Sequence, residues 1–97
     1  MATDAWESWT TKSIIAGPGG VLTAEVGAIT GDLTIHTTWT GTEVVLTVQY
    51  TEALDWYTVL GSPVPAADEH TAREIHQAMV VATKARGEAR APQTDAG

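Results

Sequence analysis

A two-residue alternation of apolar and polar side chains on both sides of Gly41-Thr42 constrains the fold of this chain more than any other feature. If these two residues form a hairpin turn, the register of the flanking strands is set. One face is then largely apolar and the other largely polar, as in a half-buried strand pair. The apolar face pairs Trp39 with Val44, Thr37 with Leu46, Ile35 with Val48 and Leu33 with Tyr50; the polar face pairs Thr40 with Glu43, Thr38 with Val45, His36 with Thr47 and Thr34 with Gln49.

Further glycine turns extend this hairpin into a predicted meander. A turn at Gly31-Asp32 would place Ala28 opposite Ile35, Val26 opposite Thr37 and Ala24 opposite Trp39. The glycine-rich stretch at 17–20 would let residues 12–16 pair with 21–25, setting Lys12 opposite Glu25 and Ile15 opposite Leu22.

The two ends of the predicted sheet are less constrained. Residues 54–60 predict a last strand, but the 51–53 link contains no Gly, Pro or Asn, so a bulged continuation of the preceding strand is an alternative. With a turn at Glu52-Ala53, Trp56 falls on the outer face next to Gln49. Around Trp6 to Trp9 we expect a strand extension or an ordered arm.

Beyond the Gly-Ser-Pro-Val-Pro stretch at 61–65 the pattern becomes helical. Asp68 is a good N-cap with Glu69 in the first turn. Gly87 is expected to end the helix. The stripe expected to pack on the sheet is Ala72, Ile75, Met79, Ala82 and the stem of Arg86.

The sequence therefore predicts an α+β fold: an antiparallel β-meander of four to five strands with one C-terminal α-helix packed on the sheet face. Residues 1–87 would form one domain, and the polar residues 88–97 a disordered C-terminal tail.

The charge balance excludes several functions. The 97-residue chain has 12 acidic and 5 basic residues, a formal net charge of −7, and no cysteine. An acidic surface lacks the cationic stripe that nucleic acids require and is repelled by anionic membranes. Disulfides, thiolate zinc sites and cysteine nucleophiles are excluded. Asp4 and Glu7 stand where a signal peptide would carry lysines, so we expect a cytoplasmic protein.

The candidates for chemistry are few. His36, on the polar sheet face, or His76, on the helix, could act as a base or ligand with Asp55 or Tyr57 in a pocket between sheet and helix. His70 and Glu74 lie one helical turn apart, but His76 projects from another side, so we predict no metal site and no cofactor. Glu69–Arg73 and His70–Glu74 are more simply surface pairs.

The candidates for an interface are tryptophans and two valines. Exposed Trp side chains bury a large area at little entropic cost. Trp6 and Trp9 lie near the start of the chain and Trp56 on the predicted outer face. Val80 and Val81 lie off the buried stripe of the helix, where contact with a second chain would cover them.

These features favour a small acidic, non-catalytic protein-interaction module or accessory subunit. Its partner would be a second copy, giving a homodimer or other homo-oligomer, or a basic protein. Two alternatives stay open: an inhibitor of a basic protein that mimics nucleic acid, and a small enzyme or ligand-binding protein.

Overall fold

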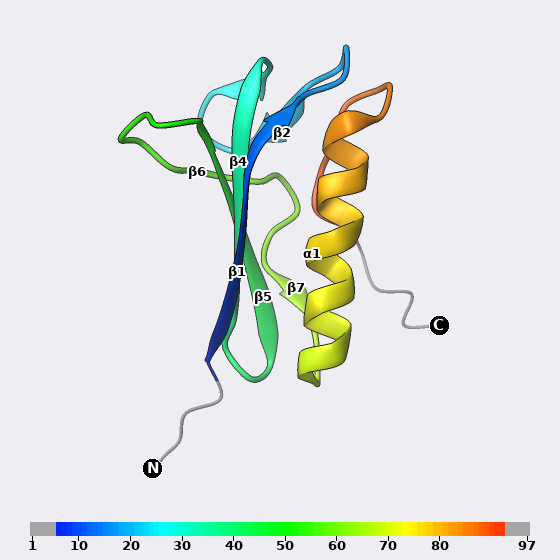
Figure 1. Ribbon diagram of the computed structural model, residues 1–97. Coiled ribbons are helices and arrows are strands. Elements are labelled where there is room, and N and C mark those ends of the chain that lie inside the picture. Colours follow the sequence, from blue (N-terminus) through cyan, green and yellow to red (C-terminus); the bar gives the residue numbers. More distant parts are fainter. Residues whose placement is uncertain (1–5, 93–97) are drawn as a thin grey trace.

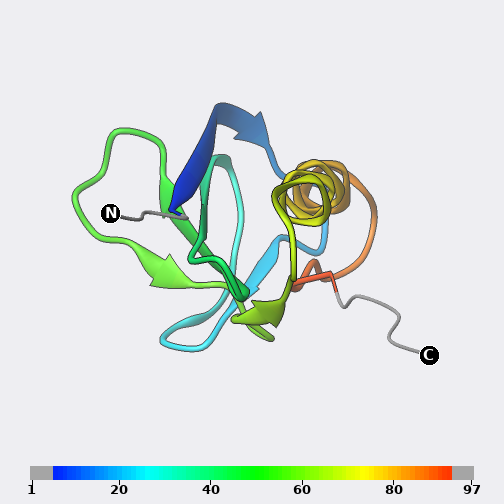
Figure 2. The same cartoon turned by 90° about the horizontal axis from the view of Figure 1, so that it is seen from below.

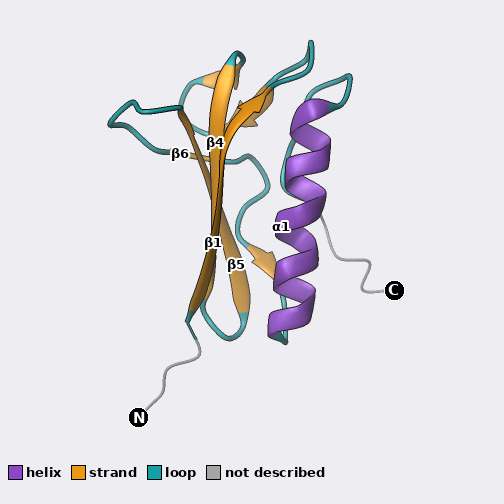
Figure 3. Cartoon of the chain, viewed as in Figure 1, coloured by secondary structure: helices purple, strands orange, loops and turns teal. Residues whose placement is uncertain are grey.

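The computed structural model describes residues 6–92, which form an antiparallel five-stranded sheet, a separate two-stranded hairpin and one C-terminal helix (Figure 1). The predicted α+β class, with the helix packed on one face of the sheet, is confirmed (Figure 3). The sheet order is β1-β4-β5-β6, with β7 also beside β5, and β2 pairs with β3. The elements are β1 (Glu7–Ile15), β2 (Val21–Thr23), β3 (Gly27–Ile29), β4 (Asp32–Trp39), β5 (Glu43–Tyr50), β6 (Tyr57–Thr58), β7 (Val64–Pro65) and α1 (Glu69–Lys84).

The β4–β5 hairpin has the predicted register, from Trp39 opposite Val44 to Leu33 opposite Tyr50. The turn is closed by the Thr40 N–H, which donates to the Glu43 carbonyl at 2.9 Å. Gly41 has a φ of 103°, which favours glycine. The predicted apolar face forms the centre of the core, with Leu33, Ile35, Thr37, Val44, Leu46 and Val48 buried.

The predicted pairing across Gly31-Asp32 is wrong, because the other neighbour of β4 is β1. β2 and β3 instead pair with each other around a short turn. In that turn the Thr23 hydroxyl donates to the Gly27 carbonyl and accepts from the Val26 N–H. The nine-residue β1 gives β4 a longer ladder than the three-residue β3 could provide.

The predicted pairing of residues 12–16 with 21–25 is also wrong. Lys12 lies instead in a bulge of β1, between Thr11 and Ile14, where the register with β4 shifts. The Glu25 carboxylate accepts hydrogen bonds from the Thr58 hydroxyl and, with a smaller effect, from the Thr58 N–H, and these bonds hold the pKa of the carboxyl below its ordinary value.

The last strand is shorter than predicted. Only Tyr57–Thr58 pairs with β5, but its register, Thr47 opposite Thr58, is the one that a turn at Glu52-Ala53 implies. Residues 51–56 form a loop that projects from the sheet on the side away from the helix (Figure 2). The sheet therefore has an inner face, covered by α1, and an outer face bordered by this loop.

Helix α1 begins as predicted and ends earlier. The Asp68 carboxylate caps it by accepting from the Thr71 N–H, and the helix stops at Lys84 rather than near Gly87. The predicted surface pairs are present, with His70–Glu74 and Arg73–Glu69 each at 3.2 Å. The buried face consists of Ala72, Ile75, His76, Met79 and Thr83, while Arg86 lies beyond the helix.

The predicted disordered tail is wrong for residues 88–92; residues 93–97 lie outside the described part of the chain. Ala89 and Ala91 are 4% and 2% exposed. The Ala89 N–H donates to the Gly20 carbonyl and the Ala91 N–H to the Leu60 carbonyl. The backbone approaches closely here, since a Cβ on Gly19 would lie 2.2 Å from the carbonyl carbon of Gly87. Small side chains therefore let this polar segment pack against the core.

We predict that Ala89→Asp lowers the free energy of unfolding by roughly 2–4 kcal/mol, because it buries a carboxylate without a partner. The control is Arg90→Asp at the neighbouring exposed position, expected within about 0.5 kcal/mol of wild type. Urea denaturation followed by Trp fluorescence measures both. Equal stability of the two variants would contradict the packing of residues 88–92.

Candidate binding face of the sheet

The outer face of the sheet combines hydroxyl groups, one imidazole and two exposed indoles. The β1–β4 register sets Ser8 opposite Thr38 and Thr10 opposite His36. Side chains directly opposite each other in an antiparallel pair share a face. The Thr10 hydroxyl and His36 Nδ1 are hydrogen-bonded at 2.7 Å, which orients the imidazole.

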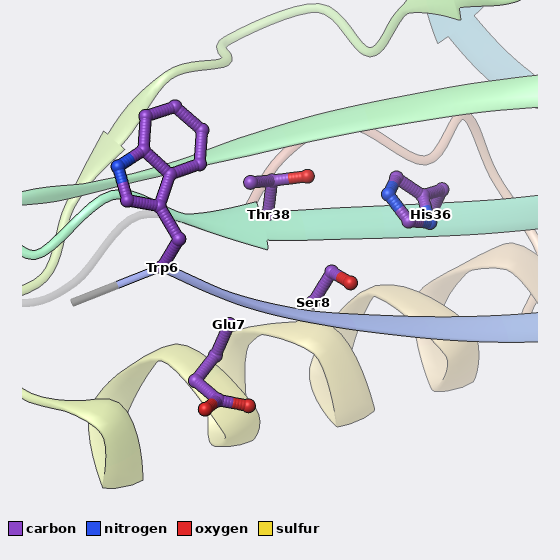
Figure 4. A pocket seen from close by; sticks show the side chains of 5 residues that line it. All are labelled: Trp6, Glu7, Ser8, His36 and Thr38. Carbon is purple, nitrogen blue, oxygen red and sulfur yellow. The ribbon is translucent and has the colours of Figure 1, made fainter. Parts of the chain in front are cut away.

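A shallow hollow of about 330 Å³ opens on this face, lined by Trp6, Glu7, Ser8, His36 and Thr38. Figure 4 shows the Trp6 indole, Ser8, His36 and Thr38 on one side of β1, whereas the Glu7 side chain points toward the helix. Trp6 is 65% exposed, so its ring forms an accessible wall. The hollow can hold a side chain or a small polar group.

A second tryptophan approaches the same imidazole from the 51–56 loop. The Trp56 and His36 ring centroids lie 5.8 Å apart at an interplanar angle of 59°. Trp56 is 44% exposed. Two accessible indoles therefore share one face with His36. We call the set Trp6, Ser8, His36, Thr38 and Trp56 the outer-face cluster.

The charges are distributed unevenly along the chain. Residues 6–67, which carry the whole sheet, contain six carboxylates and one lysine, Lys12. Residues 68–92, which carry α1 and the segment after it, contain four acidic and four basic residues. The net negative charge of the described chain thus belongs to residues 6–67, which attract cationic groups.

His76 lies on the inner face, apart from the outer-face cluster. It is 3% exposed, and its Nε2 and Nδ1 are hydrogen-bonded to the Thr11 and Thr37 hydroxyls at 2.8 and 2.7 Å. Burial, with a smaller contribution from the charge of His36, lowers the pKa of His76 below 6.5. This histidine ties α1 to β1 and β4.

The other residues predicted for chemistry do not join His36. Tyr57 is half-buried opposite Val48 and packs against the core. Asp55 is exposed in the 51–56 loop. His36, Asp55, Tyr57 and His76 therefore do not converge on one pocket between sheet and helix.

The predicted interface residues divide in a similar way. Trp9 is half-buried against the core, with its ring 6.5 Å from that of His76, and Val80 also packs partly on the core. Val81 is 66% exposed, but it lies on the helix, across the sheet from Trp56. Only Trp6 and Trp56 share an exposed face.

Sequence reasoning missed Ser8, Thr10 and Thr38 as neighbours of these indoles. The alternation of residues 6–11 was a usable signal, since Trp6, Ser8 and Thr10 share one side of a strand. Nothing in that segment indicates that its neighbour is β4, more than twenty residues further along the chain.

Within residues 6–92 no three His, Cys, Asp or Glu side chains are grouped closely enough to hold a metal ion. In the same residues, no helix has the length and apolar character needed to cross a membrane. Comparison of the chain with protein-family models, curated proteins and solved structures finds no match.

We predict that the protein loses stability as the pH falls through about 6.5. The folded-state pKa of His76 is depressed, so around this pH the unfolded chain binds more protons, and unfolding becomes easier as pH decreases. Urea denaturation between pH 7.5 and 5.5 measures the slope. His76→Gln, which has no titrating group, should flatten it, and His70→Gln, at an exposed position of the same helix, is the matched control. A slope unchanged in His76→Gln would contradict the assignment.

Proposed function

We propose that this protein is a small, non-catalytic binding module whose outer sheet face docks a basic segment of a protein partner. The observation that carries the proposal is the exposure of Trp6 and Trp56 on one face, together with His36. Exposed indoles concentrate binding energy because they bury much area with few rotatable bonds.

The charge of the sheet supports a basic partner. Cationic side chains are attracted by the excess of carboxylates in residues 6–67, and they also stack on indole faces. A lysine or arginine entering the hollow beside Trp6 would meet the Ser8 and Thr38 hydroxyls and no cationic side chain among the lining residues. Long-range attraction of this kind accelerates association and is weakened by salt.

Binding is better supported than catalysis by the environment of the two histidines. A general base needs an accessible nitrogen and an orienting partner. His76 is enclosed, with both ring nitrogens hydrogen-bonded, and the Nδ1 of His36 is bonded to a threonine rather than a carboxylate.

The cytoplasmic location is part of this proposal and rests on the sequence alone.

The test is affinity capture of the tagged full chain from its native lysate, read by mass spectrometry. Because Trp56 would anchor the contact, we expect Trp56→Ala to reduce recovery of a stoichiometric partner by about tenfold or more. Moderate salt should reduce recovery of wild type as well.

Val26→Ala is the matched control, since Val26 is an exposed apolar residue in the β2–β3 turn rather than in the outer-face cluster. It should recover the partner like wild type. A partner retained equally by Trp56→Ala and wild type would overturn the proposal. A captured nucleic-acid enzyme released by added DNA would favour mimicry instead.

A further inference from the structure

The free edge of β1 is a candidate interaction surface in addition to the outer face of the sheet. In the part of the chain that the structure describes, β1 pairs with β4 on one side and with no strand on the other. It is the longest strand, and α1 packs on the inner face without covering this edge (Figure 2). An open edge of this length is a template for another strand.

The hydrogen bonding of the sheet shows which backbone groups of β1 face its open edge. In antiparallel ladders, successive residues direct their N–H and C=O groups to opposite sides of the strand. The bond from the Thr40 N–H to Glu43 means that the even-numbered residues of β4 face β5 and the odd-numbered ones face β1. Because Trp9 pairs with Thr37, the odd-numbered residues of β1 bond to β4. Ser8 and Thr10 therefore point their N–H and C=O groups to the open edge.

The open edge ends at the β1 bulge. Ser13 has a φ of 57°, and the register shift between Thr11 and Ile14 breaks the straight run of the strand. Further on, the Gly17 N–H donates to the Thr83 carbonyl, so the end of α1 occupies this part of the edge. The accessible template is therefore residues 6–12.

We propose that two copies of this chain pair antiparallel through residues 6–12, which are Trp6 and the first part of β1, with the two-fold axis at Trp9. The backbone N–H and C=O groups that face the open edge belong to even-numbered residues. A hydrogen-bonded ladder between two copies must therefore pair even-numbered residues of one copy with even-numbered residues of the other. In the proposed register Ser8 lies opposite Thr10 of the partner subunit, Glu7 opposite Thr11 of the partner subunit, and Trp6 opposite Lys12 of the partner subunit.

The strand is self-complementary in this register. Glu7 is its only carboxylate and faces a threonine, so no like charges are opposed. Lys12, the only cation in residues 6–67, lies across from the exposed Trp6 indole, where a cation–π contact can form. A two-fold axis perpendicular to the sheet keeps both helices on one side and makes the two outer faces continuous.

This inference concerns a different occupant from the proposed function and the edge of the sheet rather than its outer face; Trp6 is the side chain that the two contacts share, and their opposite dependence on salt separates them. Each copy has a formal charge of −7, so screening reduces repulsion between copies and strengthens pairing. Binding of a basic partner is weakened by the same screening. Failure of one contact therefore does not imply failure of the other.

The first test is sedimentation equilibrium of the full chain from micromolar to millimolar concentration at low and moderate salt. Ser8→Pro removes an N–H that faces the open edge and no bond to β4. We expect dimerisation at least about tenfold weaker than in the matched control Ser8→Ala, since each dimer loses two hydrogen bonds. A wild-type protein that is monomeric throughout, or equal dimerisation of the two variants, would overturn the proposal.

A cross-linking test does not depend on whether Ser8→Pro folds. The chain has no cysteine, so Ser8→Cys introduces a single thiol that lies near its copy across the proposed axis. A short bismaleimide should link Ser8→Cys into dimers and leave Leu54→Cys, in the 51–56 loop, monomeric. Equal linking of both variants would show random collision and reject the register.

The contact between Lys12 and Trp6 is tested by charge reversal. Lys12→Glu should weaken dimerisation several-fold more than Arg86→Glu, which changes the net charge equally at an exposed position beyond the helix. Equal effects of the two substitutions would contradict the proposed register.

Discussion

The pairing of β1 with β4 is the interaction on which the rest of the structure depends. It joins residues that are far apart in the sequence, with Glu7 opposite Trp39. On the inner face it brings the Thr11 hydroxyl to His76, so that α1 is tied to the sheet by a polar contact as well as by packing. On the outer face it places Trp6 and Ser8 beside His36. Both the core and the candidate binding face therefore require this one ladder.

The contacts that His36 and His76 make with the sheet show how one residue type can have two roles. His36 and His76 are each hydrogen-bonded to a threonine of β1, but they lie on opposite faces of the sheet. Helix packing encloses His76, satisfies both of its nitrogens and lowers its pKa, which makes it part of the core. His36 remains accessible next to two indoles. Burial rather than residue identity separates a structural histidine from a candidate binding one.

The surplus of carboxylates in residues 6–67 has opposite effects on the two proposed contacts. It favours a basic partner on the outer face and disfavours a second copy at the β1 edge. Backbone hydrogen bonds and the pairing of Lys12 with an indole are short-range and can offset that repulsion at higher ionic strength. If both contacts form, ionic strength shifts the balance between a partner-bound monomer and a paired module.

The local elements were determined by the sequence itself. Alternation around Gly41-Thr42 predicted the β4–β5 register, and Asp68 with the Ile75–Met79 stripe predicted the helix, because turns, caps and periodicity are short-range effects. Only the tertiary structure decided that β1 rather than β3 pairs with β4, since an edge strand has no local signal for its neighbour. It also decided that Ala89 packs on the core within a polar segment. There, the close approach of the Gly19 backbone to Gly87 and the hydrogen bond from the Ala89 N–H to the Gly20 carbonyl hold the segment in place.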